Sequence, residues 1–369
     1  MTKILAGILG IVVIFMDHGS AGVAWYSDAN WLKRRAIVID ETKIPGASDF
    51  TNFVALVQFT SDTTLDDAGN LQADGDDILF TASDGTTKLN HELVSVDNAA
   101  GSFVAWVQIP TLLAASNTTI YLYYKNSSAT SQQNADATWD ANYIGVWHLD
   151  ANDTTPDDSS GTATTMGENG DPGEAQTGKI GSGVTVTDNS SWLTIPWGNT
   201  VNPTTTSITM CAWINRSSDT GTDEHVFAHC NTNSNRFYWR FRGGGTNDPV
   251  SGRVGSGDTS PATGNSTSTT ATWYRGCLVA DAAADTFYAR VNATSIVNGT
   301  SQGTSNAFAA NFTVGTCANG TADGFTGTLD EVQLATIARS NDWLDAEYNN
   351  QNNPAVGSWL VSITDENKP

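Results

Sequence analysis

Short runs in which hydrophobic and polar residues alternate dominate the first half of the chain. In the clearest run, Phe53, Ala55, Val57 and Phe59 occupy every second position, as expected for a strand with one buried face. Similar runs cover residues 36–39, 78–80, 88–96, 103–109 and 119–124. Segments rich in Gly, Ser, Asp and Asn separate them, which is typical of turns. This pattern predicts an antiparallel β-sandwich.

Strand-like runs continue through the second half of the chain. In the run from residue 207 to residue 214, the even positions are Ile, Met, Ala and Ile, while Cys211 and Trp213 lie on the other face. Because both faces are apolar, we expect a central strand of a second sandwich. Further runs cover residues 144–149, 226–230, 236–242, 272–279, 286–291 and 311–315, and the tail at 358–363 supplies a final strand.

One segment near the C-terminus departs from the strand pattern. Ser340 offers an N-cap oxygen, Asp342 and Asp345 fall in the first turn, and Leu344 and Tyr348 share a face at the i,i+4 spacing. These features predict one short amphipathic helix. The predicted fold class is therefore all-β, with two β-sandwich domains and one short helix near the C-terminus.

The first 24 residues have the pattern of a secretory signal peptide. Lys3 supplies a positive charge, residues 4–16 form an apolar run too short to span a bilayer, and Ala21 and Ala24 are suitable cleavage positions. An uncleaved anchor or a buried core segment is the alternative. We expect a secreted protein with no membrane insertion after signal removal. The predicted domains are residues 1–24 (signal peptide), 25–140 (first sandwich) and 141–369 (second sandwich).

The chain is strongly acidic, with 39 Asp and Glu residues against 17 Lys and Arg residues and a formal charge of −22. Because a phosphate backbone needs a cationic face, this balance argues against nucleic acid as a partner. It suits a soluble surface, or one that collects divalent cations. The four cysteines, with no CxxC pair, indicate two disulfides in an exported chain, and three connectivities are open.

Residues 324–354, GFTGTLDEVQLATIARSNDWLDAEYNNQNNP, resemble the closing motif of laminin-G-like, concanavalin A-like jelly rolls. The sequence GKIGSGVTVT at residues 178–187 is similar to the same family's approach to its second strand. The resemblance implies a two-sheet jelly roll for the second domain. It also implies binding of carbohydrate or of a cell surface.

In that family, a loop ending in Asp-Ser-Ser-Gly lies beside the Leu-Asp-Glu strand, and the two often hold a structural calcium ion. The resemblance therefore implies Asp158 and Asp330 as calcium ligands, with Asp157 and Asp153 as weaker candidates. Carboxylate oxygens are ligands that Ca²⁺ prefers. The alternative is that Asp158 caps a turn and that Asp330 accepts hydrogen bonds from backbone amides.

The first domain resembles an uncharacterised module that commonly precedes laminin-G-like domains in secreted microbial proteins. The matching pieces are WLKRRAIVID, DGDDILF, FVAWVQIP and IYLYYKN. That module has no agreed activity, so the resemblance implies no ligand for it.

The cysteines of the second domain lie in settings that resemble those of pentraxins, a branch of the same jelly-roll group. The resemblance implies a disulfide between Cys211 and Cys277, with Cys230 and Cys317 as the other pair. Each bridge is expected to contribute about 2–4 kcal/mol.

We find no catalytic arrangement in the sequence. Retaining glycosidases need two carboxylates about 5–5.5 Å apart, whereas Asp330 and Glu331 are adjacent on a strand and are expected to face opposite sides. His225 and His229 stand at i,i+4 on a strand, about 13 Å apart and too far for a shared zinc ion. The sequence predicts that the protein is not an enzyme, and a glycoside hydrolase is the less favoured interpretation.

A mixed aromatic and cationic strip is the best candidate for ligand binding. In NRFYWRFRGG, Tyr238, Arg240 and Arg242 share one strand face, and Phe, Trp and Phe alternate on the other. An aromatic ring stacks on sugar C–H groups, and arginines would attract an anionic glycan. The alternative is a solvated strand face whose arginines neutralise nearby aspartates.

Two functions are consistent with these features. The first is a secreted, non-catalytic adhesin that binds a glycan or a cell-surface polysaccharide. The second is a structural subunit of an extracellular filament, surface layer or virion appendage, which would self-associate. The fold itself does not choose between them.

Overall fold

The computed structural model describes residues 23–26, 29–66, 70–150, 156–162, 164–196, 205–232, 235–243, 250–255, 257–258, 269–299, 311–317 and 323–368. Residues 1–22 of the predicted signal peptide and the candidate ligand Asp153 lie outside this part. Strands dominate the described chain and the one long helix lies near the C-terminus, so the predicted all-β class is confirmed. Among the described residues, no helix combines the length and the apolar character needed to cross a bilayer.

The first β-sandwich consists of two antiparallel sheets, with strand orders β22-β1-β6-β3 and β2-β5-β4. Its strands are β1 (Lys33–Ile39), β2 (Phe50–Phe59), β3 (Leu79–Thr81), β4 (His91–Asp97), β5 (Ser102–Leu112), β6 (Thr118–Tyr124) and β22 (Leu360–Asn367). A 3₁₀ turn (Glu41–Lys43) and the short helix α1 (Ala135–Thr138) lie in its connections. The alternation predicted for β2 is present, because Phe53, Ala55, Val57 and Phe59 lie in the core together with Ile37 of β1.

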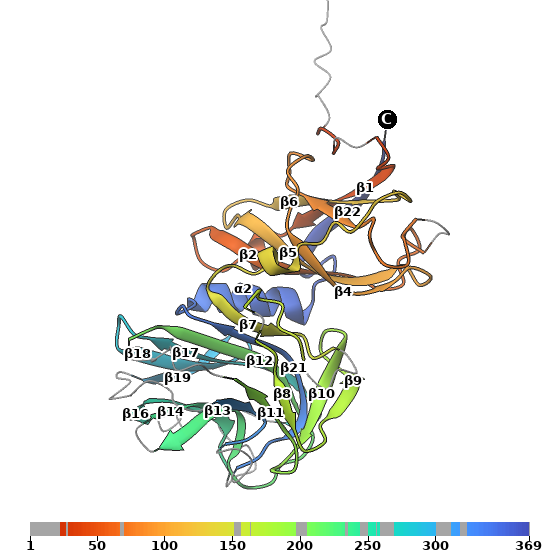
Figure 1. Ribbon diagram of the computed structural model, residues 1–369. Coiled ribbons are helices and arrows are strands. Elements are labelled where there is room, and N and C mark those ends of the chain that lie inside the picture. Colours follow the sequence, from red (N-terminus) through yellow and green to blue (C-terminus); the bar gives the residue numbers. More distant parts are fainter. Residues whose placement is uncertain are drawn as a thin grey trace, which may run out of the picture.

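Strand β22 is the last strand of the chain, yet it belongs to the first sandwich (Figure 1). It pairs antiparallel with β1 along its length. Two ion pairs cross this pairing, Arg34 to Glu366 at 2.7 Å and Arg35 to Asp365 at 2.5 Å. The prediction that the tail supplies a strand of the second sandwich is therefore wrong. Strands β1 and β22, which are far apart in the chain, are thus neighbours in the first sandwich, and basic residues of β1 pair with acidic residues of β22.

The second β-sandwich also has two antiparallel sheets. The sheet nearer the first sandwich has the order β19-β18-β17-β12-β21-β10-β9, and β7 also pairs with β21. Its strands are β7 (Tyr143–Trp147), β9 (Gly173–Thr177), β10 (Ser182–Thr187), β12 (Ile208–Arg216), β17 (Trp273–Asp281), β18 (Thr286–Val291), β19 (Thr294–Gly299) and β21 (Thr326–Ala335). The other sheet has the order β16-β15-β14-β13-β20-β11-β8. Its strands are β8 (Gly167–Asn169), β11 (Trp192–Ile195), β13 (Glu224–Thr232), β14 (Asn235–Phe241), β15 (Val250–Gly255), β16 (Gly257–Asp258) and β20 (Phe312–Val314).

Strand β12 is central, as its two apolar faces predict. It pairs with β17 on one side and with β21 on the other. Its residues Ile208, Met210, Ala212 and Ile214 lie in the core between the two sheets. The opposite face carries Cys211, which packs with the core of the first sandwich.

Helix α2 (Asn341–Asn352) lies between the two sandwiches (Figure 1). Ser340 caps it as predicted, because its hydroxyl oxygen accepts a hydrogen bond from the amide of Trp343 at 3.2 Å. The Trp343 ring packs on Phe50 and Phe53 of β2, with ring centroids 5.3 and 5.1 Å apart. The apolar side of the helix therefore completes the core of the first sandwich.

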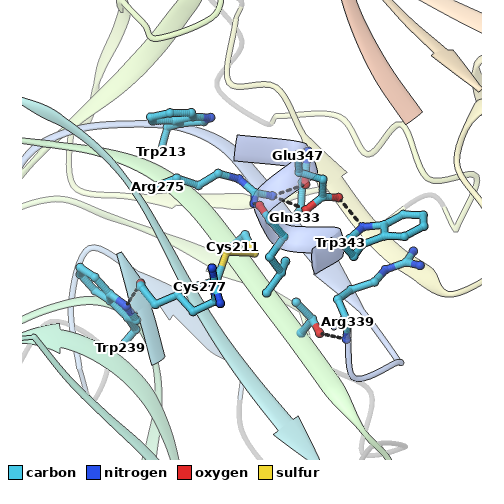
Figure 2. Close-up of a disulfide and its surroundings, with 12 residues drawn as sticks. Cys211, Trp213, Trp239, Arg275, Cys277, Gln333, Arg339, Trp343 and Glu347 are labelled. Carbon is cyan, nitrogen blue, oxygen red and sulfur yellow. Dashed lines mark hydrogen bonds and ion pairs between the residues drawn. A yellow bond between two sulfur atoms is a disulfide. The ribbon is translucent and has the colours of Figure 1, made fainter. Parts of the chain in front are cut away.

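The polar side of α2 binds the second sandwich (Figure 2). Glu347 accepts hydrogen bonds from Arg275 Nη2 at 2.7 Å, Trp343 Nε1 at 2.9 Å and the Tyr143 hydroxyl at 3.0 Å. Gln351 accepts one from the indole nitrogen of Trp213 on β12 at 2.7 Å. Because these groups are buried and hydrogen-bonded, the helix holds the two sandwiches together.

Two disulfides cross-link strands and loops of the second sandwich. Cys211 on β12 is joined to Cys277, its direct partner on β17, and Cys230 is joined to Cys317. These are the two pairs that the pentraxin resemblance implies. Disulfides persist in oxidising environments, so they indicate an extracellular or similar compartment.

Candidate functional site

The acidic pair of the closing motif lies where β21 faces the first sandwich. Glu331 has a φ angle of +49°, and the register of β21 against β12 shifts beside it, which defines a β-bulge. Leu329 and Val332, on either side of the pair, both lie in the sandwich core. Asp330 and Glu331 therefore both face away from that core. The expectation that they face opposite sides is wrong, because the bulge inserts one residue into the strand alternation.

Glu331 pairs with a histidine that also contacts the first sandwich. His148, which follows β7, lies 2.9 Å through Nδ1 from Glu331 and 3.4 Å through Nε2 from Glu92 of β4. Glu92 also accepts hydrogen bonds from Trp139 Nε1 at 2.9 Å and from the Ser159 hydroxyl at 2.5 Å. The buried Glu92–His148–Glu331 cluster thus links the two sandwiches.

The electrostatics of this cluster follow from burial and from the opposed charges. Burial alone lowers the pKa of His148, but the carboxylates of Glu331 and Glu92 outweigh it and raise that pKa well above its usual value. Burial raises the pKa of Glu331, with His148 opposing it. Burial, reinforced by the charge of Glu331, raises the pKa of Asp330 well above its usual value. The direction of the His148 pKa shift favours a protonated imidazole between Glu92 and Glu331.

Asp158, the first predicted calcium ligand, is surrounded by donors from its own loop. One carboxylate oxygen accepts hydrogen bonds from the amides of Val146 at 2.9 Å and Ser160 at 2.8 Å. The other accepts from the Thr162 hydroxyl at 2.6 Å and the Thr164 amide at 3.1 Å. These four bonds satisfy a carboxylate, so the loop-capping alternative describes its surroundings.

Asp330 is completely buried, and one of its oxygens accepts hydrogen bonds from the amides of Lys179 at 2.7 Å and Ile180 at 2.8 Å. Its other oxygen has no hydrogen-bond partner. Asp157 is exposed. Within the described ranges, no group of three metal-binding side chains includes Asp158 or Asp330. Calcium at this edge of the sandwich therefore stays a prediction.

The predicted ligand-binding strip lies on β14, but it is not an open surface. Tyr238 is 1% exposed, and its ring packs edge-on against His225 with centroids 4.8 Å apart. Arg240 forms an ion pair with Asp223 and lies 4.8 Å above the ring of Tyr238. Arg242 follows the strand and is exposed. The strip therefore offers one free cationic side chain and no ring face for a sugar.

An open cleft in the first sandwich was not predicted from the sequence. It has a volume of about 350 Å³ and lies where β5 and β6 meet the loop that precedes β4. The side chains that line it are Ala82, Ser83, Leu89, Ile109, Pro110, Thr111, Leu113, Asn117, Thr118, Thr119 and Ile120. None of them is ionisable, and the rim residues Pro110, Thr111 and Asn117 are exposed. No sequence motif marks this cleft, because residues of ordinary strand and turn composition form it.

The comparison with known families is consistent with this architecture. Residues 187–345 match the concanavalin A-like lectin/glucanases superfamily, and residues 74–164 match a domain of unknown function (DUF2341). The chain thus carries a concanavalin A-like domain preceded by that domain of unknown function, and both predicted resemblances are confirmed. The match to the domain of unknown function ends beyond β7 and so includes the first strand of the second sandwich. No curated protein matches the sequence.

Solved structures resemble the chain at low sequence identity. The receptor binding domain of botulinum neurotoxin C/D mosaic serotype has 13% identity and a TM-score of 0.43, covering 56% of this chain and 51% of that one. Domain 4 of AbnA, a GH43 extracellular arabinanase from Geobacillus stearothermophilus in complex with arabinotriose, has 18% identity and a TM-score of 0.40, covering 56% and 98%. Trypanosoma rangeli sialidase in complex with 2,3-difluorosialic acid has 10% identity and a TM-score of 0.45, covering 71% and 42%. The chain spans about half the length of the neurotoxin domain, and the likeness concerns the fold alone.

Proposed function

We propose that the protein is a secreted, non-catalytic carbohydrate-binding protein whose ligand is a neutral glycan held in the cleft of the first sandwich. The observation that carries this proposal is the open cleft of about 350 Å³ lined by apolar, hydroxyl and amide side chains. Such a volume falls within the range of small-ligand sites. A domain of the concanavalin A-like lectin/glucanases superfamily at residues 187–345 supports carbohydrate as the ligand class of the chain. The cleft itself lies outside that domain, in the first sandwich.

The chemistry of the lining suits a sugar ring. Pro110 and Leu113, which are exposed and half-buried, offer apolar contacts for the C–H groups of a pyranose, and Thr111 and Thr119 offer hydroxyls for its polar edge. Because no charged side chain lines the cleft, an anionic glycan would find no counter-charge there. Because no carboxylate or histidine lines it, the proposal assigns binding and no bond cleavage to this site.

A glycan panel with the purified full chain tests the proposal. We expect binding to neutral glycans, and we expect Thr119→Phe, which fills the cleft from β6, to weaken it at least tenfold, or about 1.4 kcal/mol. Thr294→Phe is the matched control, because Thr294 is an exposed strand threonine of the second sandwich. Equal losses in both variants, or binding only to anionic glycans that Arg240→Ala abolishes, would move the site away from the cleft. Absence of binding across the panel would reject the proposal.

A second candidate function, a self-associating structural subunit, is favoured by the position of β22. This eight-residue strand ends its sheet, and its Val361 is 46% exposed. An edge strand of this length can pair with a strand of another chain. Sedimentation of the full chain tests this: we expect oligomers that Val361→Lys disperses, and a monomer at all concentrations would exclude this candidate.

A further inference from the structure

His225 is a buried histidine whose backbone amide donates a hydrogen bond to the Asp323 carbonyl but whose ring lacks such a partner. It is 1% exposed, and neither ring nitrogen has a hydrogen-bond partner. A buried polar group without a partner costs about 1–3 kcal/mol, so it requires an explanation such as a redox role or an ion. Its edge-on contact with Tyr238 fixes the ring but satisfies neither nitrogen.

Three further groups converge on this ring. A nitrogen of His225 and the sulfur atoms of Cys230 and Cys317 all lie within 4.8 Å of one another. A carboxylate oxygen of Asp323 lies 3.8 Å from Nδ1 of His225. His225 and Cys230 come from β13, Cys317 follows β20, and Asp323 precedes β21. The four groups thus come from three separate segments that the fold brings together.

We propose that His225, Cys230 and Cys317 form a zinc site, with water as the fourth ligand and Asp323 beside the imidazole, whenever the Cys230–Cys317 disulfide is reduced. Two thiolates and one imidazole, completed by a water molecule, are a donor set that Zn²⁺ binds tetrahedrally. The sulfur atoms must separate from bonded contact to positions around a shared ion, which breaking the S–S bond permits. The pair would then be a disulfide under oxidising conditions and a metal site under reducing conditions.

An external thiol supplies the electrons that convert the Cys230–Cys317 disulfide into two zinc-binding cysteines. Two equivalents of an external thiol reduce the disulfide by two electrons, yielding the thiols of Cys230 and Cys317 and the oxidised disulfide of the reductant. Zinc binding then releases the two thiol protons to solvent, because thiolates are the ligand form. The imidazole of His225 coordinates in its neutral form, so it releases no proton.

The other disulfide provides a built-in control. Cys211 and Cys277 are buried, but Figure 2 shows Arg275, Gln333 and three tryptophans labelled around them. Within the part of the chain that the structure describes, no group of three metal-binding side chains includes either cysteine. Reduction of that bridge therefore supplies two thiols without a third ligand.

Cobalt titration of the reduced full chain tests the proposal. The chain is first reduced with an excess of dithiol, and the dithiol is then removed under nitrogen. We expect one Co²⁺ per chain, with thiolate-to-cobalt charge-transfer absorption and tetrahedral d–d bands, and displacement by Zn²⁺. Cys211→Ala/Cys277→Ala should keep this signal, and Cys230→Ser/Cys317→Ser should lose it. His225→Ala should weaken binding at least tenfold, and Asp323→Asn less.

Several results would overturn the proposal. They are the absence of stoichiometric cobalt binding, an affinity unchanged in His225→Ala, or a signal that depends on Cys211 and Cys277. Circular dichroism of each reduced chain with Zn²⁺ present reports whether the fold is retained, and a wild-type chain that zinc leaves unfolded also rejects the site. His225→Asn, a smaller change in volume, is the second variant if His225→Ala fails to fold.

Discussion

Asn350 makes the most specific contact between helix α2 and the first sandwich. Its side chain is fully buried, accepts a hydrogen bond from the Leu56 amide at 2.6 Å and donates one to the Leu56 carbonyl at 2.9 Å. Leu56 lies in β2, the edge strand of its sheet, and is itself 1% exposed. The side-chain amide therefore takes the place of the next strand for this one residue.

Replacement of Asn350 by alanine would leave two buried backbone groups unpaired. Each such group costs about 1–3 kcal/mol, so we expect Asn350→Ala to lower the free energy of unfolding by about 2–6 kcal/mol. The lower figure applies when water fills the space left by the amide. Since domains are stable by only about 5–15 kcal/mol, the loss should be large.

Urea unfolding followed by tryptophan fluorescence measures this loss as a shift of the midpoint at an unchanged slope. Asn349→Ala is the matched control, because its side chain, on the same helix, donates a single partly exposed hydrogen bond to the Lys43 carbonyl at 2.9 Å. We expect that control to cost about 1 kcal/mol. If Asn350→Ala is no more destabilising than Asn349→Ala, the amide of Asn350 does not substitute for a strand partner.

The remaining predictions concern the Glu92–His148–Glu331 cluster, the Asp158 loop and the Cys211–Cys277 disulfide. Because the native pKa of His148 is raised above 6.5, its stabilising effect is complete below that pH and is lost as the pH rises through the native pKa. The excess stability of the wild type over His148→Gln should therefore shrink as the pH is raised above about 6.5 through the native pKa, and urea midpoints whose difference does not change with pH would contradict the ion-pair assignment. Since donors of its own loop surround Asp158, we expect Asp158→Asn to lower the melting temperature by a similar amount with calcium and with chelator; a loss confined to calcium buffer would instead support the calcium site. Removal of the Cys211–Cys277 bridge, with a sequence separation of 66 residues, should cost about 4 kcal/mol in the chain-entropy relation, measured as the urea midpoint of Cys211→Ala/Cys277→Ala.

Much of the fold could be predicted because its signals are local. Alternation with a period of two identifies the buried face of β2 and the central position of β12, and the Ser340 cap identifies the start of α2. The disulfide pairs were implied by family resemblance, since four cysteines alone leave three connectivities open. These predictions depend on residues close in the chain or on a known motif.

The candidate sites were harder to predict because they depend on distant segments. Tyr238 has the strand position of a surface ring, but His225 and Arg240 pack around it and leave it 1% exposed. Asp330 and Glu331 share a face only because of the bulge in β21. A bulge changes the facing of every later residue, and no alternation pattern shows where it occurs.

The sequence by itself determined the all-β class, the two sandwiches, the helix near the C-terminus and the strongly acidic character of the chain. Periodicity, capping and composition are properties of neighbouring residues, so they can be read before the chain is folded. Only the tertiary structure decided that β22 completes the first sandwich, that His148 joins Glu92 to Glu331, and that the cleft forms between β5 and β6. Each of these depends on which strands become neighbours, and that choice is made by the burial and pairing of residues far apart in the chain.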